Sequence, residues 1–393
     1  MSAAVGLEPT PSTEAIEAPV LILGAGPAGL AVGACLKKAG IEPLILEKAN
    51  QVGSTWHRHY RRLHLHTARR HSSLPLHPLP PDFPTFPSRQ QVVDYLEDYS
   101  RTFDLRPRFG TQVARVRRSE ESWELTTDQG LFRAGSLVMA TGYNRKPYRP
   151  SFVGMENFGG TILHSSEFQT GADFTGRRVL VVGCGNSGAE IALDLAEHGA
   201  IPSLVVRRPI HVTPRELLGT PSQTSNIRLS VLPVPLADFL ALAVLRWVVG
   251  DLSSWGILRP KEGPNRQIWK YGRVPLIDVG TIDRIKDGTI SVKPGVQEVG
   301  PRSVRFTDGE EEPFDALVLA TGYRTALGDL LEDAEQLLNS RGQPHVFGEE
   351  AAPGLFFVGY RNPPTGALRE ISLEAPRVAR AIAQGEKRKR ERG

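Results

Sequence analysis

The chain has 393 residues, of which 40 % are hydrophobic and 23 % charged, and its formal net charge is +4. These proportions are typical of a globular protein, and the length predicts roughly two to three domains. Part of the positive charge lies in the tail at residues 387–390, which argues against a nucleic-acid partner. The only two cysteines, Cys35 and Cys184, provide no disulfide framework and no CxxC pair, so we expect a reducing, cytoplasmic location.

Three segments bear on the termini and on membranes. Residues 1–18 have no basic start and no long apolar run, so we expect a disordered leader and not a secretory signal. Residues 231–249 are strongly apolar, but two prolines, Asp238 and Arg246 interrupt them. A buried helix is therefore expected there and no stable membrane insertion. The basic tail, residues 386–393, is expected to be disordered.

Two glycine-rich turns each follow an apolar strand and open a helical pattern. The first, after the strand at 19–23, consists of Gly24, Ala25, Gly26, Pro27, Ala28 and Gly29. The second, after the strand at 178–182, consists of Gly183, Cys184, Gly185, Asn186, Ser187 and Gly188. Glycines permit the tight turn, and the helix N-terminus presents free N–H groups to a pyrophosphate. In this strand–turn–helix context the two turns predict two bound dinucleotides.

The charge at the end of the next strand separates the two ligands, because that position faces the ribose. In the first copy the strand at 44–46 ends at Glu47, whose carboxylate suits the ribose hydroxyls of FAD or NAD. In the second copy the strand at 204–206 ends at Arg207 and Arg208, whose guanidinium groups match the 2′-phosphate of NADPH. The alternative for the second copy is two solvated surface arginines.

An internal repeat predicts how the two domains are connected. Residues 132–143 and 314–323 each form a buried strand that ends in Ala-Thr-Gly-Tyr, with Thr141, Gly142 and Tyr143 in one copy and Thr321 and Gly322 in the other. Glycine lets such a turn pass close to a ligand. We therefore expect an α/β fold of two Rossmann-like dinucleotide-binding domains of the three-layer ββα type. The FAD domain would comprise 19–145 and 324–385, with the NADPH domain inserted at 146–323.

A histidine-rich run follows the first nucleotide unit. Residues 53–77 hold six of the ten histidines, but also five arginines and no cysteine, so we expect no metal site. A positive loop over an anionic cofactor is the better interpretation. The proline-rich residues 74–87 are expected to be extended, and Ser88 is expected to cap a helix over 89–103.

The segment 158–168 reads FxGxxxHxxxF and resembles the signature of flavin-containing monooxygenases. With the two glycine turns, Arg207 and the two Ala-Thr-Gly-Tyr turns, the resemblance extends over nearly the whole chain. Residues 63–66, 86–96 and 275–288 resemble the YUCCA-type branch. In animal-type members an asparagine lies near the flavin edge, and His66 takes that position here. Baeyer–Villiger relatives continue the signature differently from Phe168-Gln169, which disfavours an ester-forming activity.

The resemblance implies the cofactors FAD and NADPH, with O2 and a small organic molecule as substrates. It places His66 and Arg69 at the flavin edge as catalytic candidates, and leaves His164 as either a core histidine or a direct participant. The residues expected to bind cofactor are Gly24, Gly26, Pro27, Ala28, Gly29, Glu47, Lys48, Thr55, Trp56, His66, Thr141, Gly142, Tyr143, Gly183, Gly185, Asn186, Ser187, Gly188, Arg207, Arg208, Thr321 and Gly322.

The implied reaction is monooxygenation through a C4a-hydroperoxyflavin, with oxidative decarboxylation of an aromatic 2-oxo acid such as indole-3-pyruvate as the expected case. N- or S-oxygenation of amines or sulfides is an alternative, as is an uncoupled NADPH oxidase or flavin reductase. A non-catalytic NADP-sensing module is a further alternative. The segment at about 210–270 departs from Rossmann regularity and is expected to line the substrate route. The chain is compatible with a monomer or a homodimer.

Overall fold

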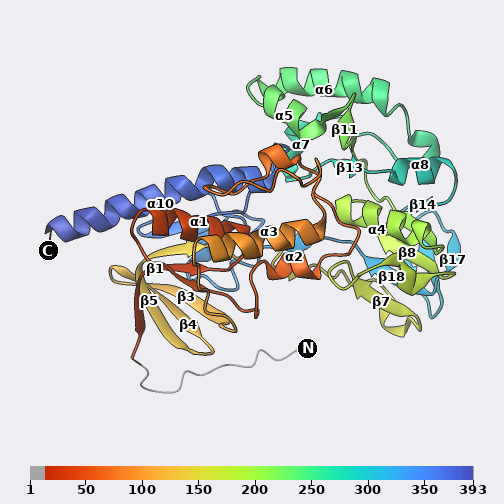
Figure 1. Ribbon diagram of the computed structural model, residues 1–393. Coiled ribbons are helices and arrows are strands. Elements are labelled where there is room, and N and C mark those ends of the chain that lie inside the picture. The colour runs from red at the N-terminus through yellow and green to blue at the C-terminus, as the bar shows by residue number, and fades with distance from the viewer. Residues whose placement is uncertain (1–13, 393) are drawn as a thin grey trace.

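Two β-sheets, one mixed and one parallel and each covered by helices, organise the protein (Figure 1). The structure is a computed structural model that describes residues 14–392. We refer to the first sheet with its helices as the first unit and to the second sheet with its helices as the second unit. The predicted α/β fold with two Rossmann-like units is confirmed.

The first unit has the strand order β2-β1-β5-β21-β20, and β4 and β3 extend from β5 as an antiparallel meander. Helices α1 and α10 pack together on this sheet, with Leu30, Leu36, Val378 and Ile382 in their shared core. The elements are β1 (Ile16–Leu23), α1 (Pro27–Lys38), β2 (Leu44–Leu46), α2 (Ser54–Arg58), α3 (Arg89–Thr102), β3 (Val113–Ser119), β4 (Ser122–Thr127), β5 (Gly130–Met139), α9 (Ala334–Leu337), β20 (Glu350–Ala352), β21 (Leu355–Phe357) and α10 (Ala367–Arg392).

The second unit has the strand order β14-β9-β8-β18-β7, all parallel, with a small antiparallel sheet β15-β16-β17 beside it. Its central strands are buried on both faces, as expected where helices and a second sheet cover a parallel sheet. The elements are β7 (Thr161–His164), β8 (Arg178–Val182), α4 (Asn186–Glu197), β9 (Ile201–Val205), α8 (Thr281–Lys286), β14 (Ser291–Lys293), β15 (Val296–Val299), β16 (Ser303–Phe306), β17 (Glu311–Pro313) and β18 (Ala316–Leu319).

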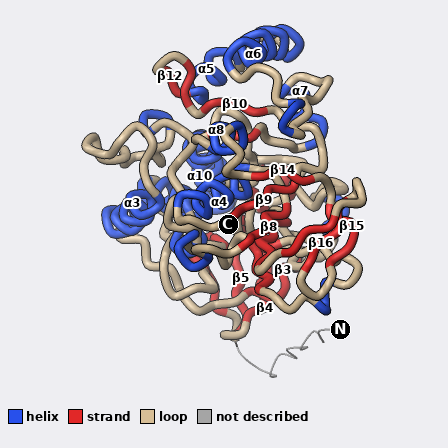
Figure 2. The backbone as a smooth tube through the Cα atoms, turned by 90° about the vertical axis from the view of Figure 1, so that its right-hand side faces the viewer, coloured by secondary structure: helices blue, strands red, loops and turns tan. Residues whose placement is uncertain are grey.

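A helical insert projects at one end of the molecule, with α5 and α6 at the top of both views (Figures 1 and 2). It leaves the second unit after β9 and returns at β13. The elements are β10 (Val212–Pro214), β11 (Glu216–Leu217), β12 (Thr220–Pro221), α5 (Ser222–Leu229), α6 (Val234–Val248), α7 (Pro264–Tyr271) and β13 (Leu276–Asp278).

The chain crosses between the two units twice, and the two crossings pair with each other. Strand β6 (Lys146–Pro147) carries the chain out of the first unit, and β19 (Tyr323–Arg324) carries it back. They form an antiparallel pair in which Tyr323 lies opposite Pro147. The second unit is thereby inserted in the first.

Three local expectations about order and burial need correction. Residues 1–13 of the expected leader lie outside the described residues, but β1 already begins at Ile16 because this part of the strand pairs with β5. The expected disordered tail is instead the end of α10, which continues to Arg392. Contacts between Lys389 and Glu386 and between Lys387 and Glu391 support this last part of the helix.

The expected buried helix at 231–249 exists as α6, but most of it is exposed. Only Ala237, Asp238 and Leu245 are buried, while Phe239 and Trp247 are 69 % and 77 % exposed. An apolar sequence on all sides of a helix predicts burial, yet here one side packs toward α7 and the other faces outward. No helix among residues 14–392 combines the length and apolarity needed to cross a bilayer.

A buried carboxyl group lies on α10. Glu374 is 2 % exposed, and its Oε2 accepts a hydrogen bond from the backbone N–H of Gly359 at 3.2 Å. Its Oε1 has no partner among the described residues. Burial raises the pKa of Glu374 from 4.5 to about 7. The folded protein therefore favours the protonated form of this group.

We expect the Glu374 carboxyl to make the protein less stable as the pH rises from 4.5 to about 7, because the folded state binds its proton more tightly. Glu374→Gln stays neutral and should raise the free energy of unfolding at pH 8 by about 2–3 kcal/mol over wild type. At pH 5 the gain should be small. Urea unfolding at both pH values measures this, with Glu391→Gln as an exposed control on the same helix. An equal effect at both pH values would contradict the assignment.

Candidate functional site

The two glycine turns have the same backbone geometry. Gly24 and Gly183 have positive φ angles of 111° and 116°, which favour glycine. A Cβ atom on Gly24 would lie 2.6 Å from the carbonyl oxygen of Ala140, and one on Gly183 would lie 2.6 Å from that of Ala320. Each glycine turn is therefore packed against the Ala-Thr-Gly turn of its own unit, a pairing that the internal repeat did not reveal.

The third glycine of each turn brings the helix close to the turn. A Cβ atom would lie 1.8 Å from the oxygen of Gly24 if placed on Gly29, and 1.9 Å from the oxygen of Gly183 if placed on Gly188. By contrast, Cβ atoms on the N-cap residues Gly26 and Gly185 would meet nothing within 4 Å. No side chain caps α1 or α4. Free N–H groups and open space at both helix starts fit a dinucleotide pyrophosphate.

The charged residues that follow the second strand of each unit differ in burial as well as in the sign of their charge. Glu47 is 6 % exposed, and it accepts hydrogen bonds from the N–H groups of Ala25 and Ala49 at 2.8 and 2.9 Å. Each carboxylate oxygen keeps further acceptor capacity for a ribose hydroxyl. Arg207 and Arg208 are exposed and follow β9 after one further residue, Val206, so their charge is available to a phosphate.

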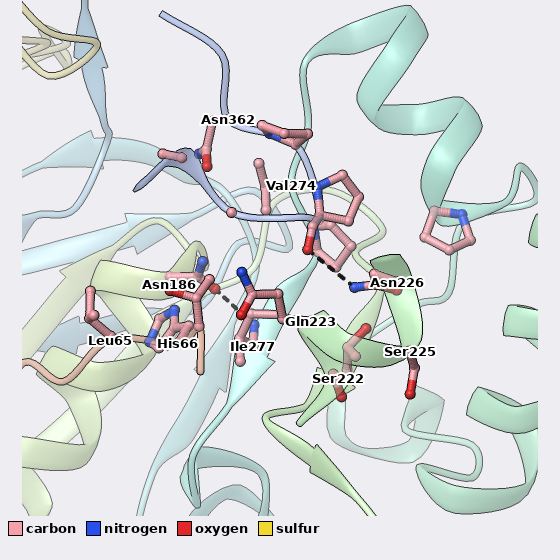
Figure 3. A pocket seen from close by; sticks show the side chains of 18 of the residues that line it. Leu65, His66, Asn186, Ser222, Gln223, Ser225, Asn226, Val274, Ile277 and Asn362 are labelled. Carbon is pink, nitrogen blue, oxygen red and sulfur yellow. Dashed lines mark hydrogen bonds between the residues drawn. The ribbon is translucent and has the colours of Figure 1, made fainter. Parts of the chain in front are cut away.

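A cavity of about 650 Å³ lies where the two units and the insert meet (Figure 3). Trp56, His66, Asn186 and Ser187, all expected from the sequence to bind cofactor, line this one cavity. Asn186 is fixed by the N–H group of Ile277, which donates to its Oδ1 at 2.8 Å. Trp56 and His66 belong to the first unit, whereas Asn186 and Ser187 belong to the second. The fold therefore brings residues of both units to one cavity.

The expected insert at 210–270 supplies much of the cavity wall. Its apolar part includes Leu217, Leu240 and Leu245, and its polar part includes Gln223, Asn226 and Arg228. Gln223 also links three segments: its Oε1 accepts from the N–H of Ala68 at 2.8 Å, and its Nε2 donates to the oxygen of Thr365 at 2.5 Å. Sequence reasoning missed these polar residues because they belong to no motif.

Two of the singled-out residues lie away from the cavity. The guanidinium group of Arg69 donates to the carbonyl oxygens of Pro80 and Phe83 at 3.1 and 2.8 Å. Arg69 thus fastens the proline-rich segment and is not a cavity residue. His164 is fully buried, its Nε2 lies 3.1 Å from the oxygen of Gly322, and burial lowers its pKa. These contacts give His164 a structural position between β7 and the Ala-Thr-Gly turn.

The remaining expected residues do not line the cavity. The Thr141 hydroxyl lies 2.7 Å from that of Tyr360, and the Thr321 hydroxyl donates to the oxygen of Tyr148. Burial lowers the pKa of Lys48 and raises that of Tyr143. The backbone of Gly142 and Gly322 has positive φ, and Thr55 is exposed on α2.

His66 has a buried partner that the sequence did not reveal. Its Nε2 lies 2.6 Å from Oε1 of Glu190, a residue of α4 that is 2 % exposed. A glutamate two residues after a glycine turn gives no sign of burial in the sequence. It becomes buried only because the first unit covers this side of α4.

The comparisons with known proteins agree with this geometry. Residues 21–217 match the family model described as pyridine nucleotide-disulphide oxidoreductase. The chain is 42 % identical to indole-3-pyruvate monooxygenase YUCCA1 of Oryza sativa subsp. japonica, over 92 % of this chain and 90 % of that protein. It is 41 % identical to indole-3-pyruvate monooxygenase YUCCA6 of Arabidopsis thaliana, over 92 % and 89 %.

Solved structures share the fold. A mutant of a flavin monooxygenase from Stenotrophomonas maltophilia aligns with a TM-score of 0.71 at 24 % identity, over 94 % of this chain and 99 % of that one. A structure of OTEMO in complex with FAD and NADP aligns with a TM-score of 0.72 at 19 % identity, over 95 % and 87 %.

Fold, glycine turns and relatives together define a flavin-dependent monooxygenase that uses FAD and NADPH. The chain belongs to the YUCCA family of these enzymes. The name of the matched family model suggests disulfide chemistry, but the chain has no pair of neighbouring cysteines that could carry it out. Cys35 and Cys184 are both free, and burial raises the pKa of Cys35 to about 11 and that of Cys184 to about 12.

The second glycine turn yields a matched pair of variants. Gly185→Ala should leave folding intact, because its Cβ meets no protein atom within 4 Å, but should weaken NADPH binding by at least roughly tenfold if the pyrophosphate approaches this backbone. Gly188→Ala should lower the melting temperature, because its Cβ would lie 1.9 Å from the oxygen of Gly183. Thermal unfolding and NADPH titration separate the two effects. An unchanged NADPH affinity in Gly185→Ala would show that the pyrophosphate does not bind at this backbone.

Proposed function

We propose that this monooxygenase oxidatively decarboxylates an aromatic 2-oxo acid of the indole-3-pyruvate type. The observation that carries the proposal is the charge of the cavity wall. Among the described residues that line it, Arg228 is the one arginine or lysine, and none is an aspartate or glutamate. The names of the YUCCA relatives, which are indole-3-pyruvate monooxygenases, support the same substrate class.

The composition of the wall discriminates between substrate classes. Apolar side chains such as Leu240 and Ile268 suit an aromatic ring, and the guanidinium of Arg228 suits a carboxylate. A protonated amine would meet an arginine and no carboxylate, so its positive charge would be poorly stabilised. The cavity therefore favours a 2-oxo acid over the amines of N-oxygenation.

The reaction converts the 2-oxo acid, O2, NADPH and a proton into CO2, the carboxylic acid shortened by one carbon, NADP+ and water. FAD, when bound and reduced by NADPH, supplies the oxygen activation. The chain's residues bind and orient: the turn at Gly24–Gly29 and Glu47 hold FAD, whereas the turn at Gly183–Gly188 with Arg207 and Arg208 holds NADPH. His66 and Trp56 border the reacting space, and the apolar wall excludes water from it.

The test follows oxygen use with three substrate classes. FAD-loaded enzyme is reduced by NADPH without oxygen and then mixed rapidly with oxygen and indole-3-pyruvate, a tertiary benzylamine or methyl phenyl sulfide, while flavin absorbance and product are recorded. We expect CO2 and the shortened acid in near-equal amount to the NADPH consumed. Hydrogen peroxide in every mixture would identify an uncoupled oxidase, and product from the amine or sulfide alone would identify N- or S-oxygenation.

Arg228→Ala sharpens this test. It should raise the KM for the 2-oxo acid by roughly tenfold or more, the usual scale of a charge-assisted hydrogen bond, with Arg228→Lys in between. Turnover of the neutral sulfide, if any, should not change. An unchanged KM for the 2-oxo acid would remove Arg228 from substrate recognition.

The assignment of the 2′-phosphate site to Arg207 and Arg208 makes a separate prediction. The double alanine variant should bind NADPH roughly ten- to a hundredfold more weakly while NADH binding stays the same. Arg302→Ala, which removes another exposed arginine of the second unit, serves as control. Stopped-flow reduction of FAD by each nucleotide gives both affinities. If the double variant still preferred NADPH over NADH, the 2′-phosphate would not bind at Arg207 and Arg208.

A further inference from the structure

Helix α4 is joined to the first unit by two carboxylates two helical turns apart. Glu190 contacts His66 at 2.6 Å. Glu197 accepts hydrogen bonds from Nε and Nη2 of Arg62, both at 2.8 Å. His66 and Arg62 come from the same loop of the first unit, and residues seven apart lie on the same face of a helix. The two links therefore share a helix, a loop and a domain interface.

Only the first of these links reaches the cavity. His66 lines it, and so does Tyr60, a buried residue of the same loop. The pKa of Tyr60 is raised well above 10, first by burial and next by the charge of Glu190, so the phenol keeps its proton beside that carboxylate. Glu190 thus lies close to two cavity residues of the first unit, whereas Glu197 is 40 % exposed.

Glu190 also lies one helical turn from the nucleotide turn. Asn186 and Ser187, at the start of α4, line the cavity and precede Glu190 by four and three residues. A helix transmits displacement along its axis as a rigid element, so a shift at its N-terminus moves Glu190 with it. The carboxylate then moves its hydrogen-bonded partner His66.

We propose that Glu190 is a positioning residue that couples nucleotide occupancy at the start of α4 to the orientation of His66 in the cavity. The proposal rests on the proposed function, which places NADP(H) at this turn. A glutamine at position 190 has the same size but a single acceptor oxygen, and its NH2 group cannot accept. Its neutral amide can therefore not hold the His66 ring as the charged carboxylate does at 2.6 Å.

The experiment compares Glu190→Gln with Glu197→Gln. The second variant makes the same charge change on the same helix and across the same interface, but away from the cavity. In FAD-loaded protein labelled with 15N at histidine, the His66 ring signals, assigned by their loss in His66→Asn, are recorded without and with NADP+. NADP+ should shift these signals in wild type and in Glu197→Gln, and leave them nearly unmoved in Glu190→Gln.

A second readout is the fraction of consumed NADPH that appears as oxygenated product. It should fall by at least roughly fivefold in Glu190→Gln and stay near the wild-type value in Glu197→Gln. Tyr60→Phe, which removes only one donor, keeps the test available if Glu190→Gln folds poorly: the NADP+-dependent His66 shift should persist in it.

The outcomes separate this proposal from the proposed function. A His66 response to NADP+ that is equal in Glu190→Gln and wild type, or a loss that is equal in Glu197→Gln and Glu190→Gln, overturns the coupling through Glu190. Product formation from 2-oxo acids tests the function alone, because the ring signals report His66 whatever the substrate.

Discussion

The contact between each glycine turn and the alanine carbonyl at the end of the neighbouring strand determines much of this structure. Ala140 and Ala320 occupy equivalent places against Gly24 and Gly183. Strand β6 begins six residues after Ala140 and β19 begins three residues after Ala320, and these two short strands pair. The nucleotide turns and the crossings between the units are therefore close together along the chain and are connected through one short β-pair.

Much of the fold and of the nucleotide sites could be predicted from the sequence because their causes are local. A positive φ at Gly24, or an approach that leaves no room for a Cβ on Gly29, requires glycine whatever surrounds it. The capping box of Ser88 with Gln91 on α3 likewise depends on neighbours in sequence. Such features can therefore be predicted from the sequence without knowledge of the tertiary structure.

The features that sequence reasoning missed depend on distant parts of the chain. Glu190 is buried because a loop more than a hundred residues away lies over it, and its helix alone gives no hint of this. Arg69 is close to His66 in sequence, yet the proline-rich segment offers it carbonyl oxygens and draws it away from the cavity. The outward face of α6 was unpredictable for the same reason, since an apolar helix is expected to find a cover.

The insert has an inner helix, α5, which is hydrogen-bonded to the first unit, and an outer helix, α6, whose outer face is exposed. Helix α5 is fastened to the first unit by Gln223, between Ala68 and Thr365, and by Thr224, which accepts a hydrogen bond from Arg70. Helix α6 has no such polar links along its outer face. Arg228 lies near the end of α5 and Leu240 lies on α6, so the charged group and part of the apolar wall of the cavity belong to helices that are anchored to different partners. Helix α6 is held to α7 through the buried Asp238, which accepts hydrogen bonds from the N–H groups of Asn265 and Arg266 at 2.8 and 3.1 Å. In the proposed function a substrate carboxylate would meet a side chain of the helix bound to the first unit, and the ring would pack on the helix bound to α7.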